Sequence, residues 1–197
     1  MDMSRRAKID LEIILQKSTE MIDKNGLDYL SFSLLAKELE IRPPSLYNHV
    51  NGLDDLKQLL AIQGLKGLYE YMLLAGIGKS GDEAIHSISR AYVEFVRKHP
   101  GLYMAATRIP HSLNEEFAHH QQAILQLVVR VLEIYELSEE MAIHIVRGLR
   151  SILHGFTSLE QMGGFGMPLD IDQSLTILIN TFVEGIHSIS RREKMTD

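Results

Sequence analysis

The 197-residue sequence contains no cysteine and no tryptophan, and it has only five prolines. Without cysteine, a disulfide scaffold, a thiol nucleophile and a thiolate-bound metal or iron–sulfur cluster are excluded. The prolines fall at expected helix boundaries, and no segment alternates steadily between apolar and polar residues, so strands are not predicted. Long uncharged apolar runs are also missing, which argues against a membrane-spanning helix and a membrane partner.

Positive charge is scarce too. The chain has 20 Lys and Arg against 26 Asp and Glu, a formal net charge of −6. Taken alone, this balance argues against a nucleic-acid partner, because phosphates are bound by Lys and Arg. The start, MDMSRRAKIDLEIILQ, carries charges from its second position, so we do not expect a signal peptide. We therefore expect a cytoplasmic protein.

The sequence does contain helical periodicity along almost its whole length, which predicts an all-α fold. Gly-rich stretches at residues 76–81 and 163–168 predict a linker and a loop between helices. The predicted helices cover approximately residues 5–25, 31–39, 43–50, 53–74, 82–98, 102–108, 112–135, 138–161 and 170–192.

Residues 31–56 carry the clearest functional signal. Two short helices around a turn at residues 40–42 predict a helix-turn-helix, whose second helix can lie in the DNA major groove. An apolar seam joins the two helices through Leu35, Ala36, Leu39, Ile41, Leu46 and Val50. The residues left facing outward are Arg42, Pro43, Ser45, Tyr47, Asn48 and His49. Any short helix pair in an all-helical protein gives such a seam, but donors and acceptors beside an exposed tyrosine favour DNA.

The same segment, LLAKELEIRPPSLYNHVNGLDDL, resembles the signature of the TetR family of transcriptional repressors. That signature has an Ala in the second helix, a turn, Leu-Tyr-x-His and an aromatic or aliphatic residue, and a Leu where the next long helix starts. The resemblance implies phosphate contacts from Ser33, Tyr47 and His49. It implies that the residues at or beside base edges are Arg42, Pro43, Pro44, Ser45 and Asn48.

Two departures from the family pattern have physical consequences. Glu40 occupies the turn position that is often Gly, so we expect backbone strain there. Leu53 replaces a frequent Lys, which implies one phosphate contact fewer. Further along, LRSILHGFTSLEQMGGFG at residues 149–166 resembles the C-terminal domain of a TetR subgroup named after a Trp-His-Gly signature, although the chain has no Trp.

These resemblances imply a three-helix DNA-binding domain at residues 1–52 and a helical effector-binding and dimerisation domain at residues 53–197. The effector is expected to be a mostly apolar small molecule. The pocket candidates are Tyr69, Met72, Tyr92, Phe95, Tyr103, Met104, Phe117, Leu125, His154 and Phe156. The candidates for the homodimer interface are Leu175, Leu178, Ile179, Phe182, Val183 and Ile186. For both sets, ordinary core packing is the alternative.

Little in the sequence indicates a catalytic site or a metal-binding site. None of the nine histidines pairs with another at i and i+4, the arrangement of helical zinc sites. The segment GIGKSG at residues 76–81 lacks the spacing of a phosphate-binding loop. We therefore predict a non-enzymatic, ligand-responsive repressor without metal or cofactor, released from a palindromic operator by its effector. The alternative is an all-helical binding or adaptor module without DNA binding, which explains the acidic charge more easily.

Overall fold

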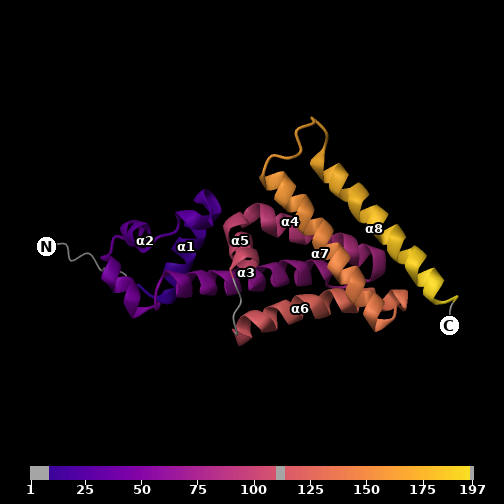
Figure 1. The fold of residues 1–197 in the computed structure, drawn as a ribbon, viewed down its shortest axis with the longest axis horizontal. Helices are drawn as coiled ribbons and strands as arrows, with labels where there is room; N and C mark the ends of the chain where they lie inside the picture. The colour runs from indigo at the N-terminus through magenta and orange to yellow at the C-terminus, as the bar shows by residue number, and fades with distance from the viewer. Residues whose placement is uncertain (1–8, 110–113, 196–197) are drawn as a thin grey trace. The chain divides into compact units, whose positions relative to one another are not determined.

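The computed structural model describes residues 9–109 and 114–195. These residues form eight α-helices and three short 3₁₀-helices, and they contain no strand (Figure 1). The prediction of an all-α fold is confirmed. In chain order the elements are α1 (Leu11–Asn25), η1 (Leu27–Tyr29), α2 (Phe32–Glu38), η2 (Pro43–Asn48), α3 (Leu53–Gly76), α4 (Gly81–Lys98), α5 (Pro100–Arg108), α6 (Glu115–Leu132), η3 (Glu133–Tyr135), α7 (Glu139–Gln161) and α8 (Ile171–Glu193).

Capping side chains set the helix starts and correct two predicted boundaries. Helix α1 begins at Leu11 because the extended residue Asp10 accepts a hydrogen bond from the Ile13 N–H at 3.0 Å. The helix was predicted to start near residue 5, but residues 9 and 10 are not helical, so this prediction was wrong for them. Residues 5–8 lie outside the described part. Helix α6 begins later than predicted, because Asn114 Oδ1 accepts from the Phe117 N–H at 3.1 Å.

The predicted helix over residues 43–50 is instead the 3₁₀-helix η2, which ends at Asn48. Pro43 and Pro44 have no N–H, so the first turn closes through the Ser45 N–H, which donates to the Arg42 carbonyl at 2.9 Å. An i to i+3 bond of this kind winds the backbone more tightly than an α-helix. Val50 then lies beyond η2, although it is buried as predicted.

The chain divides into two compact units. The first is made of the described residues of Met1–Leu65 and His99–Phe117. In this unit α1 packs against α2 and α5, and α2 packs against η2. Its core side chains are fully buried at Ile14, Ile22, Leu35, Leu46, Leu56 and Leu60. The predicted functional boundary after residue 52 stays a prediction.

The second unit is made of Lys66–Lys98 and the described residues of Ala118–Asp197. Its centre is α4, which is amphipathic and packs against α7 and α8 (Figure 1). At one end of α4, Arg97 forms an ion pair with Glu160 of α7 and another with Asp172 of α8, each at 2.7 Å. None of the helices in the described part of the chain combines the length and hydropathy needed to cross a bilayer.

At the other end of α4, Asp82 connects η3 and α8. Its Oδ1 accepts from the Tyr135 hydroxyl at 2.5 Å and lies 2.9 Å from Nε2 of His187. These two hydrogen bonds, first from Tyr135 and then from His187, lower the pKa of the Asp82 carboxyl. Burial and the Asp82 hydrogen bond raise the pKa of Tyr135. The second unit is thus braced by polar contacts at both ends of α4.

Candidate nucleic-acid interface

Helix α2 provides the support for the predicted reading segment. Ser31 caps it, with Oγ accepting from the Leu34 N–H at 3.4 Å. One face of α2 is buried through Leu35 and Ala36, against the fully buried Leu46 of η2. Since Ala36 has only a methyl side chain, the two short elements can cross closely. The apolar seam of the predicted helix-turn-helix is therefore present.

The turn between α2 and η2 has the backbone conformation that was expected from the family pattern. Glu40 has a φ of 55°, in the left-handed region that favours glycine. The turn is held by the Ile41 N–H, which donates to the Ala36 carbonyl at 2.9 Å. A glutamate at this position keeps the geometry but carries a conformational cost of about 1 kcal/mol.

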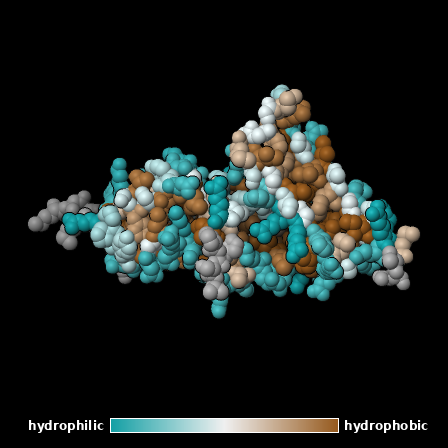
Figure 2. Space-filling view, in the orientation of Figure 1, coloured by the Kyte–Doolittle hydropathy of each residue, from teal (hydrophilic) through white to brown (hydrophobic). Residues whose placement is uncertain are grey.

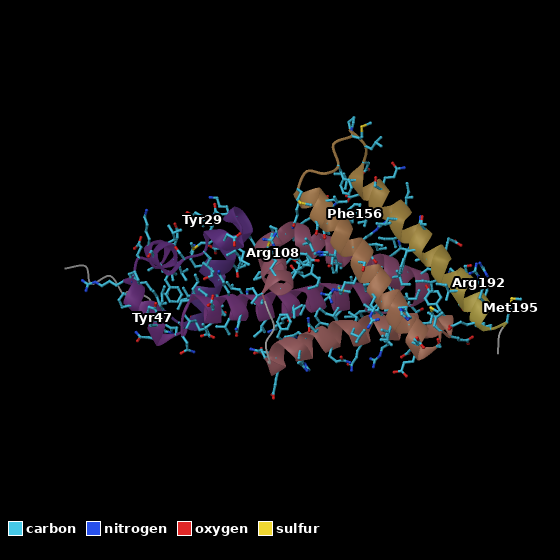
Figure 3. All side chains as sticks on the ribbon, in the orientation of Figure 1. Tyr29, Tyr47, Arg108, Phe156, Arg192 and Met195 are labelled. Atoms are coloured by element: carbon cyan, nitrogen blue, oxygen red, sulfur yellow. The ribbon has the colours of Figure 1, made fainter. Side chains whose placement is uncertain are left out.

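The turn and η2 expose a row of polar and aromatic side chains. Tyr47, labelled in Figure 3, leaves 62% of its surface exposed, which is high for an aromatic residue. Arg42, Pro43, Pro44, Asn48 and His49 are also exposed, and Ser45 is half-buried. Within the described residues, the side chains of Arg42, Asn48 and His49 make no hydrogen bond or ion pair. On α2, Ser33 is exposed as well.

Phe32 is a supporting residue that the sequence interpretation missed. Its ring meets the Tyr47 ring edge-to-face, with centroids 5.1 Å apart and an interplanar angle of 72°. The contact links the first residue of α2 to the middle of η2 and fixes the direction of the Tyr47 side chain. An aromatic residue directly after a capping serine was the available signal, but its partner lies 15 positions away.

The start of α3 is held by an acidic side chain. Asp55 Oδ2 accepts from the Asn51 backbone N–H at 2.8 Å and from the Asn51 side-chain amide at 3.2 Å. This carboxylate is therefore engaged in capping a helix, where negative charge is favourable. Between residues 31 and 56 the chain has two basic and four acidic residues, so a broad positive field is absent from this segment.

The ten pocket candidates are distributed over both units. Tyr103, Met104 and Phe117 belong to the first unit, and the other seven belong to the second. His154 is exposed, while Tyr69, Met104 and Leu125 are half-buried. The buried candidates are Met72, Tyr92, Phe95, Tyr103, Phe117 and Phe156. Their role as pocket lining stays a prediction.

The dimer candidates divide into an inner and an outer set. Leu175, Ile179, Val183 and Ile186 have their side chains buried inside the second unit. Leu178 and Phe182 are half-buried, and Phe182 packs close to Gly148 of α7. The neighbouring Ile177 is 58% exposed. Figure 2 shows apolar surface gathered over α7, α8 and the loop between them.

Comparison with known proteins identifies the family. Residues 85–182 match the family described as Tetracyclin repressor-like, C-terminal domain. The chain is 40% identical over 185 residues to the uncharacterized HTH-type transcriptional regulator YobS of Bacillus subtilis (strain 168), covering 93% of this chain and 96% of that protein. This chain belongs to the TetR family of transcriptional regulators. The predictions of a transcriptional regulator and of a non-enzymatic protein are therefore confirmed.

A second relative of this TetR-family chain is the uncharacterized HTH-type transcriptional regulator Rv0681 of Mycobacterium tuberculosis. It is 31% identical over 185 residues, which cover 93% of this chain and 84% of that protein. Among solved structures, TetR from Acinetobacter baumannii AYE superimposes with a TM-score of 0.71 at 15% identity, covering 93% and 99% of the two chains. A variant of that TetR in complex with minocycline gives 0.70 at 16%, with the same coverage.

Proposed function

We propose that this TetR-family regulator is a repressor that binds a pseudo-palindromic operator as a homodimer and is released by a small apolar effector. The observation that supports DNA contact best is the exposed row on η2 and the preceding turn. Arg42, Tyr47, Asn48 and His49 present hydrogen-bond donors and acceptors and one guanidinium group on η2 and the residues that flank it. Such side chains suit phosphate oxygens and base edges in the major groove.

In this proposal Tyr47, His49 and Ser33 contact phosphates, while Pro43, Pro44, Ser45 and Asn48 lie at base edges with Arg42 beside them. The acidic composition predicts weak non-specific binding, because few phosphate counterions are released. Affinity then depends on the geometry of two correctly spaced half-sites, and thus on dimerisation.

We place the homodimer contact on the outward faces of α7 and α8. The inner apolar residues of α8 are occupied by the core of their own unit, so the exposed Ile177 and the half-buried Leu178 and Phe182 are the residues left to pair. Leu159 of α7 is exposed as well. A dimer formed through this face would be two-fold symmetric, so each protomer would contribute one η2 segment to the operator.

The proposed effector is apolar because the buried candidate residues are aromatic side chains and methionine. The A. baumannii TetR variant holds minocycline in a similar fold, which supports the presence of a ligand site in this one. Helix α3 has residues in both units, since Leu53–Leu65 belong to the first unit and Lys66–Gly76 to the second. An effector that favours one position of this helix would shift the population away from the DNA-binding state.

The test uses a duplex that the purified protein selects from a random-sequence library. Fluorescence anisotropy should show salt-dependent binding, which the Tyr47→Ala, His49→Ala double variant weakens about 10- to 100-fold, as expected for two lost polar contacts. Tyr29→Ala is the matched control, because Tyr29 is an exposed tyrosine of the same unit outside η2. An affinity unchanged by the double variant would refute the proposed interface. Failure to select any duplex would favour an adaptor module.

A further inference from the structure

A carboxylate near the end of α1 caps a different helix, α5. Oδ1 of Asp23 accepts from the backbone N–H of Gly101 at 2.8 Å and from that of Leu102 at 3.1 Å. Its Oδ2 lies 3.1 Å from Nδ1 of His99. The side chain of Asp23 is only 17% exposed. Two backbone N–H donors and one imidazole nitrogen from a short segment therefore converge on a single, mostly buried side chain.

The amides of Gly101 and Leu102 belong to the first turn of α5, and such amides usually donate to the side chain of the helix's own N-cap residue. In α5 the N-cap residue is His99, which makes no capping side-chain hydrogen bond, and Pro100 has no N–H to donate. Gly101 and Leu102 thus carry the first free amides of α5. Asp23 satisfies both of them from a helix that lies 78 positions earlier in the sequence.

The backbones of α1 and α5 approach each other closely at the same point. A Cβ added to Gly101 would lie 2.6 Å from the backbone nitrogen of Asp23 and closer still to the carbonyl group of Ile22. The first turn of α5 also approaches α3 closely, because a Cβ added to Gly64 of α3 would lie 2.5 Å from the carbonyl oxygen of Leu102. Two glycines therefore allow the first turn of α5 to touch both α1 and α3.

We propose that the contact of Asp23 with His99, Gly101 and Leu102 couples α5 to the DNA-binding helices, which makes Asp23 a positioning residue for operator binding. A movement of α5 is passed to α1, and through the packing of α1 on α2 it reaches the element that supports η2. This inference rests on the proposed DNA-binding function. Because coupling is reciprocal, DNA bound to the first unit must also change the stability of the α5 cap.

Hydrogen–deuterium exchange of the full-length protein measures this coupling without knowledge of the effector. In the wild type, the selected duplex should slow exchange in peptides covering residues 99–108 by at least about twofold. Asp23→Ala should abolish that DNA-induced change and raise the basal exchange of Gly101 and Leu102, because the cap is lost. Asp23→Asn keeps an acceptor oxygen but loses the charge, so it should give an intermediate response.

Glu20→Ala is the matched control, because it removes one acidic side chain from the exposed face of the same helix. It should leave both the basal exchange and the DNA response of residues 99–108 unchanged. The proposal is overturned if DNA leaves these residues unaffected in the wild type, or if Asp23→Ala responds to DNA as the wild type does. Failure to select any duplex would refute the proposed DNA-binding function. Faster basal exchange of residues 99–108 in Asp23→Ala would still show that Asp23 caps α5.

Discussion

In the first unit, the polar side chains of Arg42, Asn48 and His49 stay unbonded within the described residues, whereas in the second unit polar side chains connect helices. There, Arg97 pairs with two helices, and Asp82 accepts from Tyr135 beside His187. The second unit uses these groups to hold its own fold. Within the described residues, the row on η2 makes no such contacts, which is the pattern expected of a recognition surface in the function proposed above.

The helices of the reading segment are also much shorter than those of the second unit. The reading segment consists of α2 with seven residues and η2 with six, while α7 and α8 have 23 residues each. Short elements cannot be stable on their own, so η2 depends on the few apolar side chains that anchor it. The exposed row and its buried anchor therefore have separate functions, and substitutions should separate them.

The largest expected effect on stability separates two adjacent residues of η2. Leu46→Ala removes a fully buried side chain and should lower the free energy of unfolding by about 3 kcal/mol. Tyr47→Ala removes an exposed ring and should cost less than about 1 kcal/mol, while it weakens operator binding. Urea denaturation measures both values. Equal losses of stability would show that Tyr47 belongs to the core rather than to the recognition surface.

The second unit offers a comparison between two neighbouring cations. Arg97→Gln removes contacts to Glu160 and Asp172 and should cost about 1 to 2 kcal/mol, because Glu160 is only 18% exposed and would lose a charged partner. Lys98→Gln removes an exposed i,i+4 pair with Glu94 and should have a much smaller effect on stability, because water screens that pair. Thermal unfolding distinguishes the two. A larger loss for Lys98→Gln would contradict the role given to Arg97.

The sequence was sufficient for features that depend on local chemistry. The Ser31 cap and the strained turn at Glu40 each depend on residues within a few positions of one another, and the buried seam follows from the helical spacing of apolar residues on either side of that turn. Capping hydroxyls and left-handed turns follow from such short-range patterns. The 3₁₀ winding of η2 was missed, because the tandem proline was interpreted as a helix start and not as the loss of two donors.

Contacts between distant segments were beyond prediction. The Phe32–Tyr47 ring contact and the Asp23 cap of α5 join residues that no periodic pattern relates. The dimer contact predicted on the apolar face of α8 stays a prediction, because burial inside one chain gives the same pattern of apolar residues. Hydrophobic spacing identifies the buried side of a helix, but it does not identify which chain covers that side.

A smaller effect should separate two glutamates that share a left-handed backbone. Glu40 has a φ of 55° in the first unit, and Glu136 has a φ of 54° in the second. Glu40→Gly should stabilise the protein by about 0.5 to 1 kcal/mol, because glycine adopts this conformation without steric cost. Glu136→Gly also removes the ion pair with Lys194, so its gain should be smaller. Chemical denaturation would reject this reasoning if Glu136→Gly were the more stabilising change.

The smallest effect concerns the pH dependence of the brace at Asp82. Its pKa is lowered in the folded state, so its contribution to stability is complete above the unfolded pKa of about 4 and is lost as the pH falls through the folded value. Asp82→Asn should therefore flatten the decrease in urea midpoint below about pH 4, whereas Glu83→Gln, at the adjacent exposed carboxylate, should change it less. If the urea midpoint of both variants decreased below about pH 4 as in the wild type, the hydrogen bonds from Tyr135 and His187 would contribute no pH-dependent stability. The second unit would then not be braced through this carboxylate.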